Sequence, residues 1–159
     1  YLSSVGRGSN LLLNTPPDRR GLLRENDIKS LKGFKKIIDE SFAKNLALGA
    51  HATASSIRGN AEEFGPANLT DGTTTDIVID LGIEKSIRYI VLQEYIRLGQ
   101  RVKSFTIEVL KNEDWLEVAH GTTIGYKRII KINEANSSQI RIRILDSKAC
   151  PVMAGVEVY

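Results

Sequence analysis

Cysteine and histidine are scarce in this chain of 159 residues. It holds one cysteine, Cys150, so an internal disulfide bond and a thiolate metal cluster are both excluded. A catalytic thiol would need a histidine partner, and the two histidines, His51 and His120, stand at spacings that imply no pairing. Cys150 precedes Pro151, and we interpret it as a small buried residue at the entry to a strand.

Long apolar runs and a charge of one sign are also missing. No apolar run approaches the roughly 20 residues of a membrane-spanning helix. The 22 basic and 19 acidic residues leave a formal net charge of +3. Basic residues alternate with isoleucine over residues 140–144, which indicates a solvated sheet face rather than a stripe that follows nucleic-acid phosphates. The composition is typical of a globular chain with room for one domain and a fragment.

The first region of the chain predicts one strand and one helix. Residues 5–14 form a short leucine-rich run that stops at a Pro-Pro turn over residues 15–21, as a buried strand of a parallel α/β sheet does. Asp18 is interpreted as fixing that turn, and Asp27 suits the first turn of the helix that follows. Residues 25–42 have helical spacing, with one apolar face made by Ile28, Leu31, Phe34, Ile37 and Ile38. One strand and one helix cannot form such a sheet, so we expect the rest of it upstream of Tyr1.

From about residue 44 the pattern changes to short alternating runs. They predict an antiparallel sandwich or jelly roll whose strands cover residues 76–81, 87–92, 103–109, 115–118, 127–132, 139–145 and 152–159. Residues 111–114 predict a hairpin turn. Trp115 begins one of the strands, and we expect its side chain in the core.

Two sets of motifs resemble one family of enzymes. The segment 6–22, which runs Gly-Arg-Gly-Ser-Asn-Leu-Leu-Leu-Asn and on through Pro-Pro-Asp-Arg-Arg-Gly-Leu, resembles the end of the catalytic barrel of α-L-fucosidases of glycoside hydrolase family 29, closest to members that favour α-1,3/1,4-linked fucose. Segments 93–102, 121–128 and 146–151 resemble the discoidin-like (coagulation factor 5/8 type C) β-sandwich that follows the barrel in many of them.

The resemblance implies a fold and a function. The fold would be mainly β: a galactose-binding-like sandwich over residues 44–159, preceded by the last strand and helix of an α/β barrel over residues 1–43. The parent protein would be a retaining exo-glycosidase that removes terminal fucose from glycans in the periplasm or outside the cell. An alternative is a stand-alone carbohydrate-binding module or lectin, in which residues 1–43 are only a flank. A protein–protein adhesion sandwich is a third possibility and would show a large apolar patch.

No catalytic residue is predicted in this chain. Retaining glycoside hydrolysis needs two carboxylates about 5 Å apart, and in the resembled enzymes both lie upstream of the part present here. The chain alone is therefore expected to hydrolyse nothing. Arg7, Asn10 and Asn14 are candidates for the rim of the substrate site, although hydrogen bonding at the end of the strand explains them as well.

The resemblance also implies a structural calcium site. Calcium binds six to eight hard oxygen atoms, and the ligands would come from Asn68, Asp71, Thr73, Val156 and Glu157. A simple Asp-Gly turn is the alternative for residues 68–73. The segment between Asp71 and Asp76 is shorter than in the family and lacks the Tyr-Trp pair that commonly follows.

Sugar-binding sandwiches present aromatic and polar side chains on loops at one end. The candidates for such a site, with fucosylated or galactose-type sugars as ligands, are Arg58, Asn60, Phe64, Tyr95, Arg97, Gln100, Arg101 and Tyr126. The stretches 100–102 and 126–128 have a second interpretation, which we favour, as docking surfaces toward the barrel.

Overall fold

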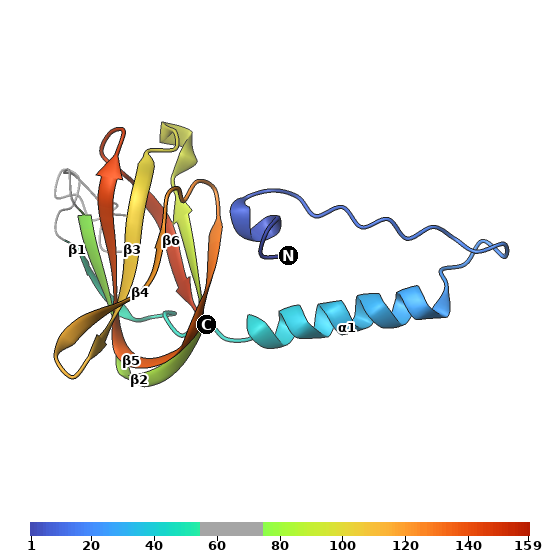
Figure 1. The fold of residues 1–159 in the computed structure, drawn as a ribbon, viewed down its shortest axis with the longest axis horizontal. Helices are drawn as coiled ribbons and strands as arrows, with labels where there is room; N and C mark the ends of the chain where they lie inside the picture. Colours follow the sequence, from blue (N-terminus) through green and yellow to red (C-terminus); the bar gives the residue numbers. More distant parts are fainter. Residues whose placement is uncertain (55–74) are drawn as a thin grey trace.

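A computed structural model of the chain describes residues 1–54 and 75–159. Figure 1 shows the strands gathered in one body, from which residues 1–43, here called the arm, project to one side. The elements in chain order are η1 (Val5–Arg7), α1 (Glu25–Ser41), β1 (His51–Ala54), β2 (Thr75–Glu94), η4 (Ile96–Leu98), β3 (Val102–Lys111), β4 (Asp114–Gly121), β5 (Arg128–Ser147) and β6 (Met153–Val158).

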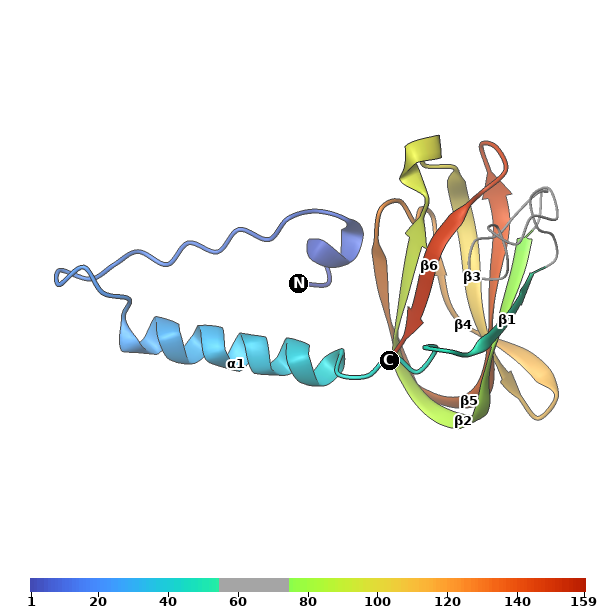
Figure 2. The same cartoon turned by 180° about the vertical axis from the view of Figure 1, so that it is seen from behind.

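All the strand pairs among the described residues are antiparallel, as predicted. The strands form a six-stranded sheet in the order β1-β2-β5-β3-β4, and β6 pairs with β2. β2 and β5 are 20 residues long, and both curve around the lower end of the body so that their two halves lie in opposite layers (Figures 1 and 2). The predicted mainly β fold with one α-helix is confirmed.

Each long strand corresponds to two predicted short ones. The predicted strands 76–81 and 87–92 are the halves of β2, joined through a register shift between Asp80 and Lys85. Gly82 sits in this shift at φ +78°, and its N–H donates to the carboxylate of Asp80 at 2.8 Å. A glycine between two predicted strands suggests a turn, but here Gly82 lies in a bulge that bends one continuous strand.

The core fills the space between the two layers. Side chains alternate between the two faces of each strand, and the apolar residues of the inner faces are fully buried, including Ile77, Ile90, Phe105, Ile107, Ile140 and Ile142. Trp115 is not among them. It pairs with Leu110 on the outer face of β3 and β4, and Arg141 lies over its ring at 4.5 Å from the centroid. The prediction of a core tryptophan is therefore wrong, because the register places Trp115 on the polar face.

The predicted hairpin turn at residues 111–114 is confirmed. Lys111 pairs with Asp114, and the two residues between them, Asn112 and Glu113, have φ values of 50° and 70°. Positive φ at both central positions defines a type I′ turn, which favours Asn-Gly. Glu113 occupies the position that glycine would fill without steric cost.

Replacing Glu113 with glycine is expected to stabilise the protein. The substitution removes the steric cost of a side chain on a residue with positive φ, but it also makes the unfolded chain more flexible. We therefore expect the free energy of unfolding to rise by about 0.5 to 1 kcal/mol. Denaturant unfolding measures the difference. Glu117→Gly, in the middle of β4, is the matched control and is expected to destabilise; a loss of stability in Glu113→Gly would contradict the turn assignment.

The arm differs from its prediction in one respect. Residues 9–18 are extended but belong to no strand, and the side chain of Leu12 is 94% exposed, with Leu11 and Leu13 also exposed. A buried strand was expected over residues 5–14, but Val5–Arg7 form η1 and the rest forms no strand. It is absent because no other strand among the described residues lies beside this segment, so its backbone groups have no ladder partners and its leucines have nothing to pack against.

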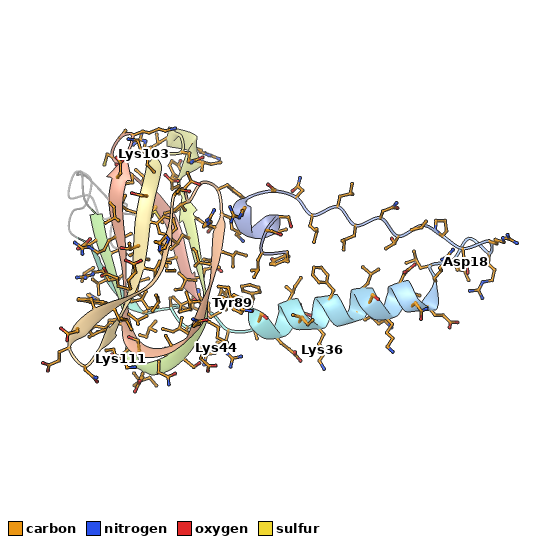
Figure 3. The ribbon with its side chains drawn as sticks, in the orientation of Figure 1. Asp18, Lys36, Lys44, Tyr89, Lys103 and Lys111 are labelled. Atoms are coloured by element: carbon orange, nitrogen blue, oxygen red, sulfur yellow. The ribbon has the colours of Figure 1, made fainter. Side chains whose placement is uncertain are left out.

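The helix and the turn of the arm match their predictions. α1 covers Glu25–Ser41, with Asp27 in its first turn, and Lys36 lies on the side turned away from the extended segment (Figure 3). No residue of α1 is fully buried, and Ile37 is 63% exposed. Asp18, at the far end of the arm, accepts hydrogen bonds from the backbone N–H groups of Arg20 and Leu22 at 2.8 and 3.2 Å. It fixes the turn, as expected.

Aromatic rings join the arm to the body. The ring of Phe42 lies 5.2 Å from that of Tyr89, 5.1 Å from that of Tyr159 and 6.0 Å from that of Tyr1, measured between centroids. Tyr1 in turn contacts Phe34 of α1 at 6.4 Å. Such edge and tilted pairs add to the apolar burial. This cluster orients α1 with respect to β2 and β6.

Tyr159 is expected to titrate late. Burial raises its pKa to about 12 from an ordinary value of 10, helped by the hydrogen bond that its hydroxyl donates to Glu157 at 2.7 Å. Because the folded state keeps this proton more tightly, the stabilisation is fully present below pH 10 and is lost as the pH rises from 10 to about 12. Phenolate absorbance of the wild type minus Tyr159→Phe should show a midpoint near 12; a midpoint near 10 would contradict the assignment.

Candidate functional site

Three loops meet at one end of the body, and the first of them contains η4. They are residues 95–101, 122–127 and 147–152, here called the loop end, and they contain most of the three segments that the sequence analysis singled out. Glu94 lies beneath them with 3% of its surface exposed. The carboxylate of Glu94 accepts hydrogen bonds from the backbone N–H groups of Arg101 at 2.9 Å, Val102 at 3.0 Å and Gly125 at 2.7 Å. One buried side chain thus holds two of the loops together.

Arg101 connects the first loop to the third. Its guanidinium donates through Nη1 to the carbonyl oxygen of Cys150 at 2.5 Å and through Nε to that of Leu98 at 3.2 Å. The backbone adds hydrogen bonds from the N–H of Lys148 to the carbonyl of Arg101 and from the N–H of Tyr95 to the carbonyl of Val152, both at 2.8 Å. Arg101 was predicted as a sugar ligand, but these contacts use two of its donor groups to position the loops.

The outer surface of the loop end is partly aromatic. Tyr95 is 41% exposed and Tyr126 is 63% exposed. Ile96 and Leu98 of η4, which follows Tyr95, are exposed as well. Arg97 is exposed on the same turn. The structure therefore brings Tyr95, Arg97 and Tyr126 to one end of the body, as a binding or docking surface requires. Arg58, Asn60 and Phe64 lie outside the described residues.

The first turn of the arm packs directly on this end. Gly6 is buried against Ile129 of β5, so close that a Cβ atom at Gly6 would lie 3.1 Å from the Cβ of Ile129. Gly8 has a φ of +76°, and a Cβ atom added to it would lie 3.6 Å from the backbone N and O atoms of Lys127. The Gly-Arg-Gly motif therefore has two causes: a larger residue at Gly6 would push η1 away from β5, and the positive φ of Gly8 favours glycine.

The rim candidates are distributed along the arm. Arg7, Asn10 and Asn14 are all exposed. A groove of about 560 Å³ lies between the extended segment, α1 and the second loop, and Asn10 lines it together with Ser9, Phe34 and Tyr126. Asn14 does not line this groove. The sequence analysis grouped the three residues, but the structure brings only Arg7 and Asn10 to the seam between arm and body.

The predicted calcium ligands are described only in part. Val156 and Glu157 lie on β6, and the carboxylate of Glu157 accepts the hydroxyl hydrogen bond of Tyr159. Asn68, Asp71 and Thr73 lie outside the described residues. Within residues 1–54 and 75–159, no three His, Cys, Asp or Glu side chains lie close enough to hold a metal ion. Calcium binding stays a prediction.

The comparisons with known proteins cover the whole chain. The putative α-L-fucosidase 1 of rice (Oryza sativa subsp. japonica) is 34% identical over 173 aligned positions, which take in 100% of this chain and 34% of the rice protein. A GH29 fucosidase of Ruminococcus gnavus, solved in complex with fucose, superposes with a TM-score of 0.90 at 29% identity over 100% of this chain and 35% of that chain. The chain is similar to α-L-fucosidases over its full length.

Both fucosidase relatives are much longer than this chain, which spans about a third of their length. The rice alignment is longer than the 159 residues present here, so the relative contains residues without a counterpart. A chitosan-binding module from Paenibacillus sp. IK-5 superposes with a TM-score of 0.62 at 23% identity, over 72% of this chain and 97% of the module, which shows a shared fold. No protein-family model matches the chain.

The fucosidase relation covers the arm as well as the body. It therefore includes the motif around Gly6 and Gly8 and the loop end, which the structure places in contact. The sequence analysis did not single out Glu94 for a role of its own, although it lies inside a quoted segment. Nothing in the local sequence indicates this role, because the burial of Glu94 and its three N–H donors arise only in the folded chain.

Proposed function

We propose that the chain is the carboxy-terminal region of a retaining α-L-fucosidase that removes terminal α-L-fucose from glycans. In this proposal residues 1–43 are the last strand and helix of the catalytic barrel, and residues 44–159 are an accessory sandwich of galactose-binding-like fold. The observation that carries it is the similarity to fucosidases along the entire chain, arm included. A stand-alone lectin would have no reason to keep an arm that matches these enzymes.

The surface of the arm supports this assignment. Six large apolar side chains of the arm are exposed: Leu11, Leu12, Leu13, Leu22, Leu23 and Ile37. Clusters of exposed apolar residues mark interfaces, and a central strand and its helix in a barrel have apolar surfaces on both sides. The remaining strands and helices of a barrel are the partner that fits an unpaired extended segment beside an amphipathic helix.

The loop end is proposed as the functional face of the sandwich. Its exposed Tyr95 and Tyr126 and the adjacent Arg97 suit contact with a sugar ring and its hydroxyl groups. The same surface suits docking on the barrel, because η1 of the arm already packs beside it. Binding would make the sandwich a targeting module, whereas docking would make it a stabilising partner of the barrel.

Calorimetric titration of this chain separates the two roles. Fucose, galactose and Lewis-type oligosaccharides are added with calcium and then with chelator. Saturable heats that Tyr126→Ala abolishes support a targeting module, and loss of binding with chelator supports the proposed calcium site. Flat heats from a folded sample exclude sugar binding and leave the docking role.

The catalytic part of the proposal needs a separate experiment. A protein that carries the whole catalytic domain together with this chain should release the aryl group from an aryl α-L-fucoside, and this chain alone should not. Inactivity of the longer protein would overturn the assignment. The family relation also supports a location in the periplasm or outside the cell, which fractionation of the source organism tests. No helix among the described residues is long and apolar enough to cross a membrane.

A further inference from the structure

Two arginines meet at the seam between the arm and the body. Arg7 lies between Gly6 and Gly8, and these two glycines contact Ile129 and Lys127 of the body. Arg128 lies between the same two body residues. The two glycine contacts therefore fix Arg7 beside Arg128, although 121 positions separate them in the sequence.

Neither guanidinium is neutralised within the described part of the chain. The guanidinium groups of Arg7 and Arg128 make no ion pair or hydrogen bond with any residue that the structure describes, and the same holds for the Lys127 ammonium group. Burial lowers the pKa of Arg128, and the positive charge of Arg7 lowers it further. Lys127 and Arg128 are half-buried and Arg7 is exposed beside them. Like charges held together without counter-ions are unfavourable until an anion joins them.

The surroundings of this cationic cluster suit a ligand. Of the three cations, Lys127 lines the groove of about 560 Å³ at the seam, whereas Arg7 and Arg128 are the chain neighbours of the lining residues Gly8 and Lys127. The lining of this groove also includes the polar groups of Ser9, Asn10 and Tyr126, and no acidic side chain among the described residues. Its volume is within the range of small-molecule sites. Guanidinium groups bind carboxylates and sulfates through parallel hydrogen bonds, which favours arginine wherever such planar or tetrahedral oxyanions are recognised.

We propose that Arg7, Lys127 and Arg128 form a binding site for one oxyanion, a carboxylate or a sulfate ester, at the junction of arm and body. Two sources offer this chemistry. One is an acidic substituent on a glycan that lies along the groove, with Tyr126 beside the sugar ring. The other is an acidic side chain of the catalytic domain, which would lock the arm to the sandwich. The identity of these two sources of the oxyanion rests on the proposed function, whereas the site itself does not.

The site is tested on this chain with small anions at constant ionic strength. Sodium sulfate and glucuronate, with glucose as the neutral counterpart of glucuronate, are titrated against nitrogen-15-labelled protein. Saturable shifts of the Gly8 and Lys127 amides are expected with both anions and not with glucose. Arg128→Gln should weaken binding about ten-fold or more, and Arg7→Gln should weaken it by a comparable factor, since each removes a charge-assisted contact.

Arg19→Gln is the matched control. It removes an exposed arginine from the turn beside Asp18, at the far end of the arm, and should change the Kd less than two-fold. Absence of saturable shifts in the wild type would overturn the proposal, as would an equal effect of the control, which would indicate diffuse attraction by net charge. Unfolding curves of all three variants verify that each remains folded.

A protein that includes the catalytic domain distinguishes the sources. If a protein carboxylate fills the site, sulfate no longer binds to the longer protein, and Arg128→Gln lowers its Tm. If the ligand is an acidic glycan, glucuronate binds to both proteins with similar Kd. Failure of fucosidase activity in the longer protein would overturn the proposed function and leave the sulfate result on this chain unaffected.

Discussion

Glu94→Ala is expected to lower the free energy of unfolding by about 3 to 5 kcal/mol. The substitution leaves the N–H groups of Arg101, Val102 and Gly125 without their acceptor in a site that is 3% exposed. Each unsatisfied buried donor costs about 1 to 3 kcal/mol, and partial entry of water reduces the sum. Denaturant unfolding measures the loss.

Glu94→Gln should lie between the wild type and Glu94→Ala. Its amide oxygen can keep the hydrogen bonds from Arg101 and Val102, but its NH₂ group would face the N–H of Gly125, so we expect a loss of about 1 to 3 kcal/mol. Glu117→Ala, on an exposed position of β4, is the control and should change stability by less than about 0.5 kcal/mol. Equal stabilities of the two Glu94 variants would show that the hydrogen bonds from Arg101 and Val102 contribute nothing.

The loops themselves should respond more than the core. Because Glu94 joins the first loop to the second, its removal frees both at one end of the sheet. In Glu94→Ala the amides of residues 95–101 and 122–127 should exchange with solvent faster, while those of β3 and β5 stay protected. Sugar binding or barrel docking, whichever the loop end performs, should weaken with it.

Gly121→Ala is expected to destabilise the protein by about 1 to 3 kcal/mol. A Cβ atom at Gly121 would lie 2.6 Å from Cζ and 2.7 Å from Cε1 of Phe105, whose ring is 1% exposed in the core. The ring has no free space to move into, so strands β3 and β4 must shift apart. A lower denaturation midpoint with an unchanged denaturant slope is the expected observation.

Gly33→Ala is the matched substitution with the opposite sign. No atom lies within 4 Å of the added Cβ at Gly33, in the interior of α1, and alanine is favoured over glycine in a helix by about 1 kcal/mol. The amides of α1 should exchange more slowly in this variant. A stabilising Gly121→Ala would mean that Phe105 can repack, and would contradict the packing described here.

Much of the fold was predictable because its signals are local. The period-two alternation of residues 139–145 and the apolar face of residues 25–42 depend only on neighbours in the chain, and both elements are present. The turn at residues 111–114 and the role of Asp18 are equally local. The predictions that were wrong depended on the rest of the molecule. Leu12 is exposed because no strand lies beside it, and Trp115 is outside the core because of the β3–β4 register.

The candidate site shows the same division. Tyr95, Arg97 and Tyr126 were selected as loop residues of types that bind sugars, and the structure places them at one end. The role of Arg101 was not predictable, because its partner Cys150 lies 49 residues away. Glu94 and the Arg7–Arg128 pair were missed for the same reason: each is defined by contacts between distant segments.

By itself, the sequence determined an arm with one helix, an antiparallel β body and a similarity to α-L-fucosidases. These follow from periodicity, turn residues and motifs, which are properties of short stretches of chain. Only the tertiary structure decided that four predicted strands are two continuous ones, that Glu94 joins the loops and that two arginines share the seam. The physical reason is that hydrogen bonding, burial and charge repulsion act between atoms close in space, whatever their separation along the chain.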